Sequence, residues 1–287
     1  VQSFDIIQDT LLITGDRYGM VSIFNIQYLP NDSLEIIPLA TKQTHQKKTN
    51  IQSVRGIKLD SANSWVSIGK DGVVQINRYY QEKSEIRTLS TLLNDSVRLS
   101  SIEASDIYER KKLIIAATID GSLFEYRFDR SGNLQTDTIY TNPSLNENRR
   151  ITAIKYTPSG NDIIIGLNDG ELKILNKLNK KFRNMDRSRE HSLAIKSIDV
   201  QGRCVLTGSR DARVKLHYWQ NSNLTGYSDY VLVYTNHDPD NEIRKVVFDE
   251  TGRKVISMSD KIIRRWSTDV NELFEKLNEI RTDKEDE

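Results

Sequence analysis

Apolar and polar residues along this chain follow a pattern that recurs at a regular interval. Each copy has an apolar run, a tight turn that usually contains Asp-Gly, and a second alternating run. Such a turn between two runs is a strong local signal for a β-hairpin. The clearest copies span Trp65–Ile76, Leu113–Phe124, Ile163–Ile174 and Cys204–Leu216, and weaker ones span Leu11–Phe24 and Lys254–Trp266.

Further strand-like segments lie before and after the hairpins. Alternating segments precede it at Ser53–Leu59, Ile151–Tyr156, Ile195–Val200 and Ile243–Phe248. More polar segments follow it at Ile86–Ser90, Leu134–Tyr140 and Tyr230–Tyr234. Alternation with a period of two marks half-buried strands, and four strands per repeat describe a propeller blade. The sequence therefore predicts an all-β propeller with six recognisable units over residues 1–266.

Unit six carries four residues of a known repeat. His237 precedes its first strand, Ser257 lies in the second, Asp260 is at the turn, and Trp266 follows six residues later. This arrangement resembles the WD40-repeat family. The resemblance implies that the four side chains form a hydrogen-bonded chain that staples the blade.

The other units match this family pattern less completely. Unit five has His191, Thr207 and Asp211, with His217 where the family has Trp. Units two to four keep the turn aspartates Asp71, Asp120 and Asp169, but Asn77, Tyr126 and Leu175 stand at the Trp position. The resemblance extends to about Trp266, and it implies that the turn aspartates are structural.

The sixth unit lacks an outer strand in the sequence pattern. Either residues 1–7 supply that strand, or residues outside this sequence complete a seventh blade, and we favour the second alternative. The chain begins with Val1 rather than Met, so we expect it to be part of a longer polypeptide.

Residues 267–287 form the second predicted domain, a short helix with a charged tail. Asp269 and Glu272 have capping-box spacing, and apolar residues from Val270 to Ile280 share one helical face. The segment weakly resembles the ends of WD40 domains in bacterial multidomain signalling proteins.

Composition excludes several kinds of function. The net charge of +1, from 41 basic and 40 acidic residues, argues against a general nucleic-acid binder. The single cysteine, Cys204, excludes an internal disulfide, fits a cytoplasmic location and is expected to be a small buried hydrophobe. The four histidines have no metal-ligand spacing, and we predict no metal and no cofactor. No apolar stretch reaches the length of a membrane helix.

Family geometry places the hairpin turns and the loops before the first strands on one rim. A rim with several Arg side chains suits recognition of a protein or peptide through bidentate contacts. The predicted binding residues are Lys70, Arg149, Arg150, Asn168, Arg210 and Arg213. We predict the polar stretch Leu39–Asn50 to be a loop between blades.

The leading hypothesis is a non-catalytic propeller that recognises a protein, a peptide, a ligand or another domain of its own polypeptide. It would be the sensing or regulatory domain of a larger cytoplasmic signalling protein. One alternative is a propeller enzyme with channel-mouth carboxylates. Another is nucleic-acid binding by the basic stretch Lys177–Arg189, which includes Lys180 and Arg183.

Overall fold

The computed structural model describes residues 1–30, 33–60, 63–93, 102–141, 145, 148–185, 191–219, 230–234, 241–249, 251 and 254–267. It divides into two compact units, Val1–Ile151 and Thr152–Glu287. The helix predicted in residues 267–287 lies almost entirely outside the described residues, and so does His237. No helix in the described part has the length and apolar content needed to cross a membrane.

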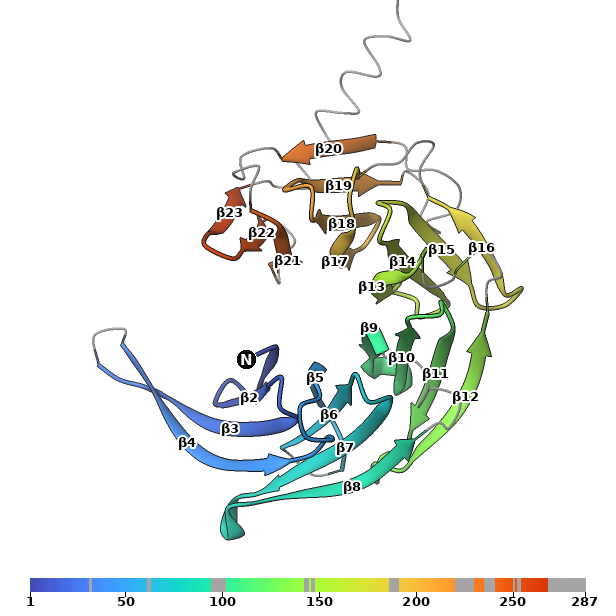
Figure 1. The fold of residues 1–287 in the computed structure, drawn as a ribbon. Helices are drawn as coiled ribbons and strands as arrows, with labels where there is room; N and C mark the ends of the chain where they lie inside the picture. The colour runs from blue at the N-terminus through green and yellow to red at the C-terminus, as the bar shows by residue number, and fades with distance from the viewer. Residues whose placement is uncertain are drawn as a thin grey trace, which may run out of the picture. The chain divides into compact units, whose positions relative to one another are not determined.

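Unit 1 contains three four-stranded antiparallel sheets, blades 1 to 3, each with its strands in sequence order (Figure 1). Blade 1 has β1 (Ser3–Ile7), β2 (Leu11–Gly15), β3 (Met20–Tyr28) and β4 (Leu34–Gln43). Blade 2 has β5 (Ile51–Ile57), β6 (Ser64–Gly69), β7 (Val73–Tyr80) and β8 (Glu85–Leu93). Blade 3 has β9 (Ile102–Tyr108), β10 (Leu113–Thr118), β11 (Leu123–Phe128) and β12 (Leu134–Tyr140).

Unit 2 contains blades 4 to 6, and β13 begins at the boundary residue Ile151. Blade 4 has β13 (Ile151–Tyr156), β14 (Asp162–Leu167), β15 (Leu172–Asn176) and β16 (Lys181–Asn184). Blade 5 has β17 (Ile195–Gln201), β18 (Cys204–Ser209), β19 (Val214–Tyr218) and β20 (Tyr230–Tyr234). Blade 6 has three strands in the described part, β21 (Ile243–Phe248), β22 (Lys254–Ser259) and β23 (Ile263–Ser267).

All six hairpins predicted from the sequence are present as the second and third strands of the six blades. Two details differ from the prediction. Leu39–Gln43 form the end of β4 rather than a loop, since each pairs with β3 or lies in its bulge. Residues 3–7 do not supply an outer strand to the sixth unit, because β1 pairs with β2 as the inner strand of blade 1.

The apolar core of each unit lies between consecutive blades. One cluster joins blades 1 and 2 and includes Ile13, Ile23 and Trp65. A second cluster joins blades 2 and 3, and unit 2 has one between blades 4 and 5 and another between blades 5 and 6. Cys204 belongs to the last of these, and burial raises the pKa of its thiol to about 12, as expected for a structural cysteine.

Polar side chains connect the inner strands of neighbouring blades. In unit 1 the Ser3 hydroxyl accepts a hydrogen bond from the Val54 amide at 2.9 Å, and Asp5 accepts one from Gly56 at 2.8 Å. Unit 2 repeats this arrangement between β17 and β21, where Ser197 and Asp199 accept from the amides of residues 246 and 248. Each Ser-x-Asp segment therefore binds alternate amides at the edge of the next blade.

Candidate functional site

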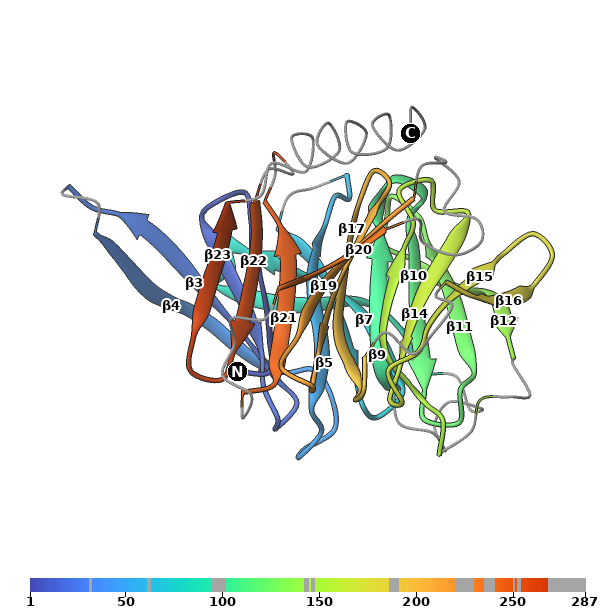
Figure 2. The ribbon, with the colours of Figure 1, turned by 90° about the horizontal axis from the view of Figure 1, so that it is seen from above.

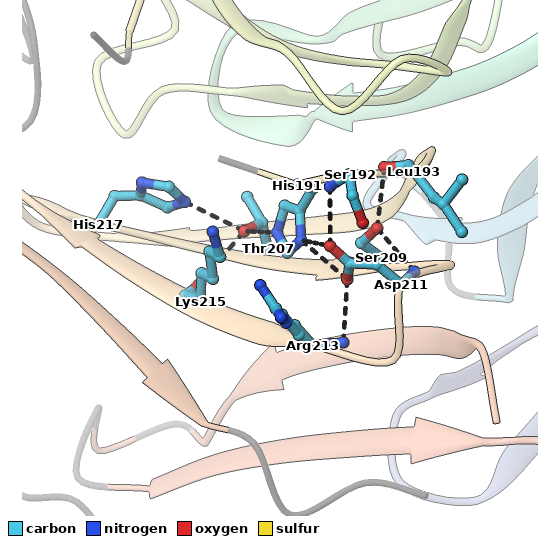
Figure 3. Close-up of polar contacts among 9 residues, drawn as sticks. All are labelled: His191, Ser192, Leu193, Thr207, Ser209, Asp211, Arg213, Lys215 and His217. Atoms are coloured by element: carbon cyan, nitrogen blue, oxygen red, sulfur yellow. Dashed lines mark hydrogen bonds and ion pairs between the residues drawn. The ribbon is translucent and has the colours of Figure 1, made fainter. Parts of the chain in front are cut away.

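The best-defined polar cluster is a histidine network in blade 5 (Figure 3). His191 lies ahead of β17, and its Nδ1 is 3.0 Å from a carboxylate oxygen of Asp211 in the β18–β19 turn. Its Nε2 is 2.9 Å from the hydroxyl of Thr207 on β18. That hydroxyl is in turn 3.1 Å from Nε2 of His217 on β19. Four side chains from one blade therefore form a continuous hydrogen-bonded chain.

Burial and hydrogen bonding fix the charge states of His191 and Asp211, which form one end of this network. The side chains of His191 and Asp211 are 0% and 4% exposed. Burial lowers the pKa of His191, which is therefore neutral at pH 7 and donates its Nδ1 proton. Burial alone would raise the pKa of Asp211, but His191 and the amides of Ser192 and Arg213 lower it to about 2. Asp211 is therefore an ionised carboxylate held by three donors.

Blade 2 contains a second network of the same kind, which the sequence pattern did not reveal. His45 Nδ1 is 3.0 Å from Asp71, and its Nε2 is 3.0 Å from the hydroxyl of Ser67. The amide of Asn77 donates to the same hydroxyl at 3.1 Å and accepts from Thr88 at 2.9 Å. Asn77 thus takes the position that His217 has in blade 5. The signal that could have found it is the histidine that precedes β5, as His191 precedes β17.

The turn aspartates of blades 3 and 4 have local contacts. Asp120 accepts from the Thr118 hydroxyl and from the Ser122 amide at 3.1 Å. Asp169 accepts from the Glu171 amide at 3.2 Å. These contacts hold the carboxylates against their own turns, as expected when a short polar side chain caps a turn.

Blade 6 differs from blades 2 and 5. Trp266 donates its indole N–H to the Ser257 hydroxyl at 3.0 Å. Asp260 is 57% exposed and receives two hydrogen bonds from Arg244 on β21, at 2.8 and 3.0 Å. Its predicted partner His237 is among the residues that are not described. The hydrogen bonds and charge of Arg244 lower the pKa of Asp260.

Lys70 and Arg210, which are among the predicted binding residues, form ion pairs with their neighbours. In unit 1, Lys70 lies 3.3 Å from Glu103. In unit 2, Arg210 pairs with Glu242, which also binds Arg244 at 2.8 Å. Arg210 remains 60% exposed.

The other four predicted binding residues lie in turns or just before strands. Arg213 is exposed beside the blade 5 network. Asn168 is half-buried in the turn after β14, and Arg149 and Arg150 are half-buried just ahead of β13. All three of these half-buried residues take part in polar contacts. The turn that carries Arg210 and Arg213 adjoins the approach to β17, because the Arg210 amide donates to the Ala194 carbonyl at 2.9 Å.

Within the part of the chain that the structure describes, no three His, Cys, Asp or Glu side chains gather as a metal site would require. In both networks Nε2 of the histidine that binds the turn aspartate contacts a hydroxyl, that of Ser67 or Thr207, rather than a further metal-binding group. Both networks connect strands and turns of a single blade.

Comparisons with known proteins agree with this description of the blades. Residues 108–201, which run from the end of β9 through β17, match the model of the anaphase-promoting complex subunit 4 WD40 domain. A comparison with curated protein sequences gave no match.

Two similar solved structures are both of Sqt1 from Chaetomium thermophilum, at 17% identity and covering 92% of this chain. One is a crystal structure with a TM-score of 0.68, covering 68% of that chain. The other shows Sqt1 bound to the N-terminus of the ribosomal protein L10, with a TM-score of 0.69 and 71% coverage.

The repeated antiparallel blades define the chain as a β-propeller. More specifically, it is a β-propeller of the WD40-repeat type, as its sequence pattern predicted.

Proposed function

We propose that this chain binds a protein or peptide partner through an exposed, arginine-containing surface formed by the β18–β19 and β22–β23 turns and the start of β21. We call this surface the turn surface and define it by Arg210, Arg213, Glu242, Arg244 and Asp260. The observation that carries the proposal is that two of its three arginines, Arg210 and Arg244, are held in place by ion pairs while remaining accessible. Arg210 and Arg244 are 60% and 46% exposed.

The ion pairs of the turn surface orient Arg210 and Arg244. Glu242 contacts both Arg210 and Arg244, and Asp260 receives two hydrogen bonds from Arg244. A planar guanidinium that is already oriented loses little side-chain entropy when it binds a carboxylate. A partner with acidic side chains or a chain terminus can therefore exchange with Glu242 or Asp260 at low cost.

The fold supports the same proposal. The structurally similar Sqt1 has been solved with the N-terminal segment of another protein bound to it. The blade 5 network also holds the backbone of the turn surface, because Asp211 accepts a hydrogen bond from the backbone amide of Arg213. We infer that the chain acts by recognition and carries out no catalysis.

Affinity capture tests this proposal. The whole chain, the double variant Arg210→Glu/Arg213→Glu, and the control Arg127→Glu serve as baits, and captured proteins are identified by mass spectrometry. Arg127 is a matched control because it is 51% exposed and paired with Asp137, but lies on β11. We expect one set of proteins to be held by the wild type and the control and lost from the double variant. Equal capture by all three baits would contradict the proposal.

We further propose that this recognition serves a larger cytoplasmic signalling or regulatory protein. The single buried cysteine suits a reducing compartment. Immunoblotting of fractionated native cells with an antibody to this chain tests both points. A cytoplasmic band much larger than 33.0 kDa is expected, and a band of that mass would contradict the proposal of a larger protein.

A further inference from the structure

Leu193 is an exposed leucine beside the blade 5 network and next to the turn surface. It lies in the segment ahead of β17, two residues after His191, and it is 45% exposed. Figure 3 shows that its side chain extends away from His191. Isolated exposed hydrophobes are ordinary, so the surroundings of Leu193 decide whether it has a role.

The β18–β19 turn fixes the backbone on both sides of Leu193. The Ser192 amide donates a hydrogen bond to Asp211 at 3.0 Å. The Leu193 carbonyl accepts one from the Ser209 hydroxyl at 2.9 Å, and the Ala194 carbonyl accepts one from the next backbone amide of the turn, also at 2.9 Å. Three successive residues are therefore each held by a hydrogen bond to the same turn.

Blade 4 holds the same segment from its other side. Gly170 in the β14–β15 turn accepts a backbone hydrogen bond from the His191 amide at 3.4 Å. A Cβ on Gly170 would lie 3.1 Å from the Leu193 carbonyl oxygen, so the two backbones are closely packed. Blades 4 and 5 lie side by side in both views of the ribbon, and β14 contacts β17 (Figures 1 and 2). Leu193 therefore projects from a rigid backbone, and binding there costs little backbone entropy.

Blade 2 shows that the fold does not require an apolar side chain at this position. Lys47 lies two residues after His45, as Leu193 lies two residues after His191. In both blades the residue between them donates its amide to the turn aspartate. Lys47 is exposed, as Leu193 is. Packing of the blade therefore does not account for the leucine, whereas contact with a partner does.

The exposed charged side chains that the β18–β19 turn places next to Leu193 are positive. Arg210 is 60% exposed, and Arg213 is exposed as well. The carboxylate of this turn, Asp211, is buried and bound by the histidine and two backbone amides. A carboxylate from a partner can form a charge-assisted hydrogen bond with either arginine, whereas a Lys or Arg side chain would be repelled.

We propose that the partner of the turn surface is a peptide segment that places a large apolar side chain against Leu193 and the carboxylate of an Asp or Glu against Arg210. Because the Arg210 amide binds the carbonyl of the residue after Leu193, both contacts can come from residues close together in the partner's sequence. This proposal names the class of partner for the proposed function and rests on it.

Selection of random linear peptides displayed on phage, with the whole chain as bait, tests this proposal. We expect the selected peptides to contain Asp or Glu close to a large apolar residue. Fluorescence polarisation then measures their dissociation constants for the wild type and its variants. Leu193→Ser removes the apolar contact and is expected to raise these constants about tenfold, whereas Leu193→Met is expected to bind like the wild type. Arg210→Glu/Arg213→Glu is expected to abolish binding.

Leu178→Ser is the matched control. Leu178 is 95% exposed and follows β15 in blade 4, at the opposite end of that strand from the β14–β15 turn. This variant is expected to bind the peptides like the wild type. The hydrogen bonds around Leu193 use its backbone, so Leu193→Ser is expected to keep the circular dichroism of the wild type.

Peptides that Leu193→Ser binds as tightly as the wild type would overturn this proposal, and so would selection of basic peptides or of none. Affinity capture with the arginine variant separates such a result from a failure of the proposed function. If proteins held by the wild type are still lost from Arg210→Glu/Arg213→Glu, only the class of partner is wrong. If they are retained, the proposed function is wrong as well.

Discussion

Blades 5 and 6 have a turn aspartate at the same place in the repeat, but the two carboxylates have different environments. Asp211 is 4% exposed and is bound by His191 and two backbone amides. Asp260 is 57% exposed and is bound by Arg244. The identity of a turn residue in a repeat therefore does not fix its role. The buried histidine makes Asp211 part of the blade, whereas Asp260 belongs to the exposed turn surface.

The largest difference in stability between the two blades is expected when each turn carboxylate is removed. Asp211→Ala leaves a buried imidazole and two amides without their acceptor and is expected to lower the free energy of unfolding by about 4 kcal/mol. Asp260→Ala is expected to leave the free energy of unfolding unchanged, because its partner Arg244 is exposed and hydrated. Urea unfolding followed by circular dichroism compares the stability of the two variants. An equal loss of stability in both would show that the two carboxylates have the same role.

The space around two glycine residues, one of them next to His191, gives a second test. Gly170 has φ +87°, and an added Cβ would overlap the carbonyl of His191, so Gly170→Ala is expected to cost about 3 kcal/mol. Gly202 has φ +55° with open space around it, so Gly202→Ala is expected to cost about 1 kcal/mol. Thermal unfolding of both variants measures the difference, and similar midpoints would show that the fold does not hold His191 closely.

The blade 5 network also predicts a pH dependence. The folded-state pKa of His191 is lowered from 6.5, so the unfolded chain takes up this proton more readily. The contribution of His191 to stability is complete above pH 6.5 and is lost as pH falls below it, by at most about 1.4 kcal/mol per pH unit. Urea unfolding at pH 7 and pH 5 should show a smaller loss in His191→Gln than in the wild type. Equal losses would mean that His191 is not buried as a neutral group.

The smallest effect is expected in blade 6. Trp266→Phe removes the indole N–H that binds Ser257 but keeps most of the ring, so it should cost about 1 kcal/mol. Ser257→Ala in the same background is expected to add little, because the two groups act together. Fully additive losses in a double-mutant cycle would show that the hydrogen bond contributes nothing.

The sequence predicted the hairpins because Asp-Gly turns and alternating strands are local signals. It predicted where His191, Thr207 and Asp211 lie in the repeat, and the family resemblance implied that such residues are joined by hydrogen bonds within one blade. His45 was missed because it lies 26 residues from Asp71 in a stretch predicted to be a loop. Pairing of Arg210 with Glu242, on another blade, depends on blade packing and has no local signal.

Blade 1 has exposed apolar residues that could not be predicted for a related reason. Its apolar residues alternate like those of every other blade, and the pattern predicts burial for all of them. Only the packed structure shows that Val54 is covered and Phe4 is not.

The function proposed for this chain is recognition of a protein by the exposed turn surface. A photo-crosslinking residue placed at Arg213, and another at Arg127 on β11, tests it most directly in native cells. We expect a defined crosslinked partner from position 213 that is absent from position 127. The same crosslinks from both positions, or none from position 213, would contradict it.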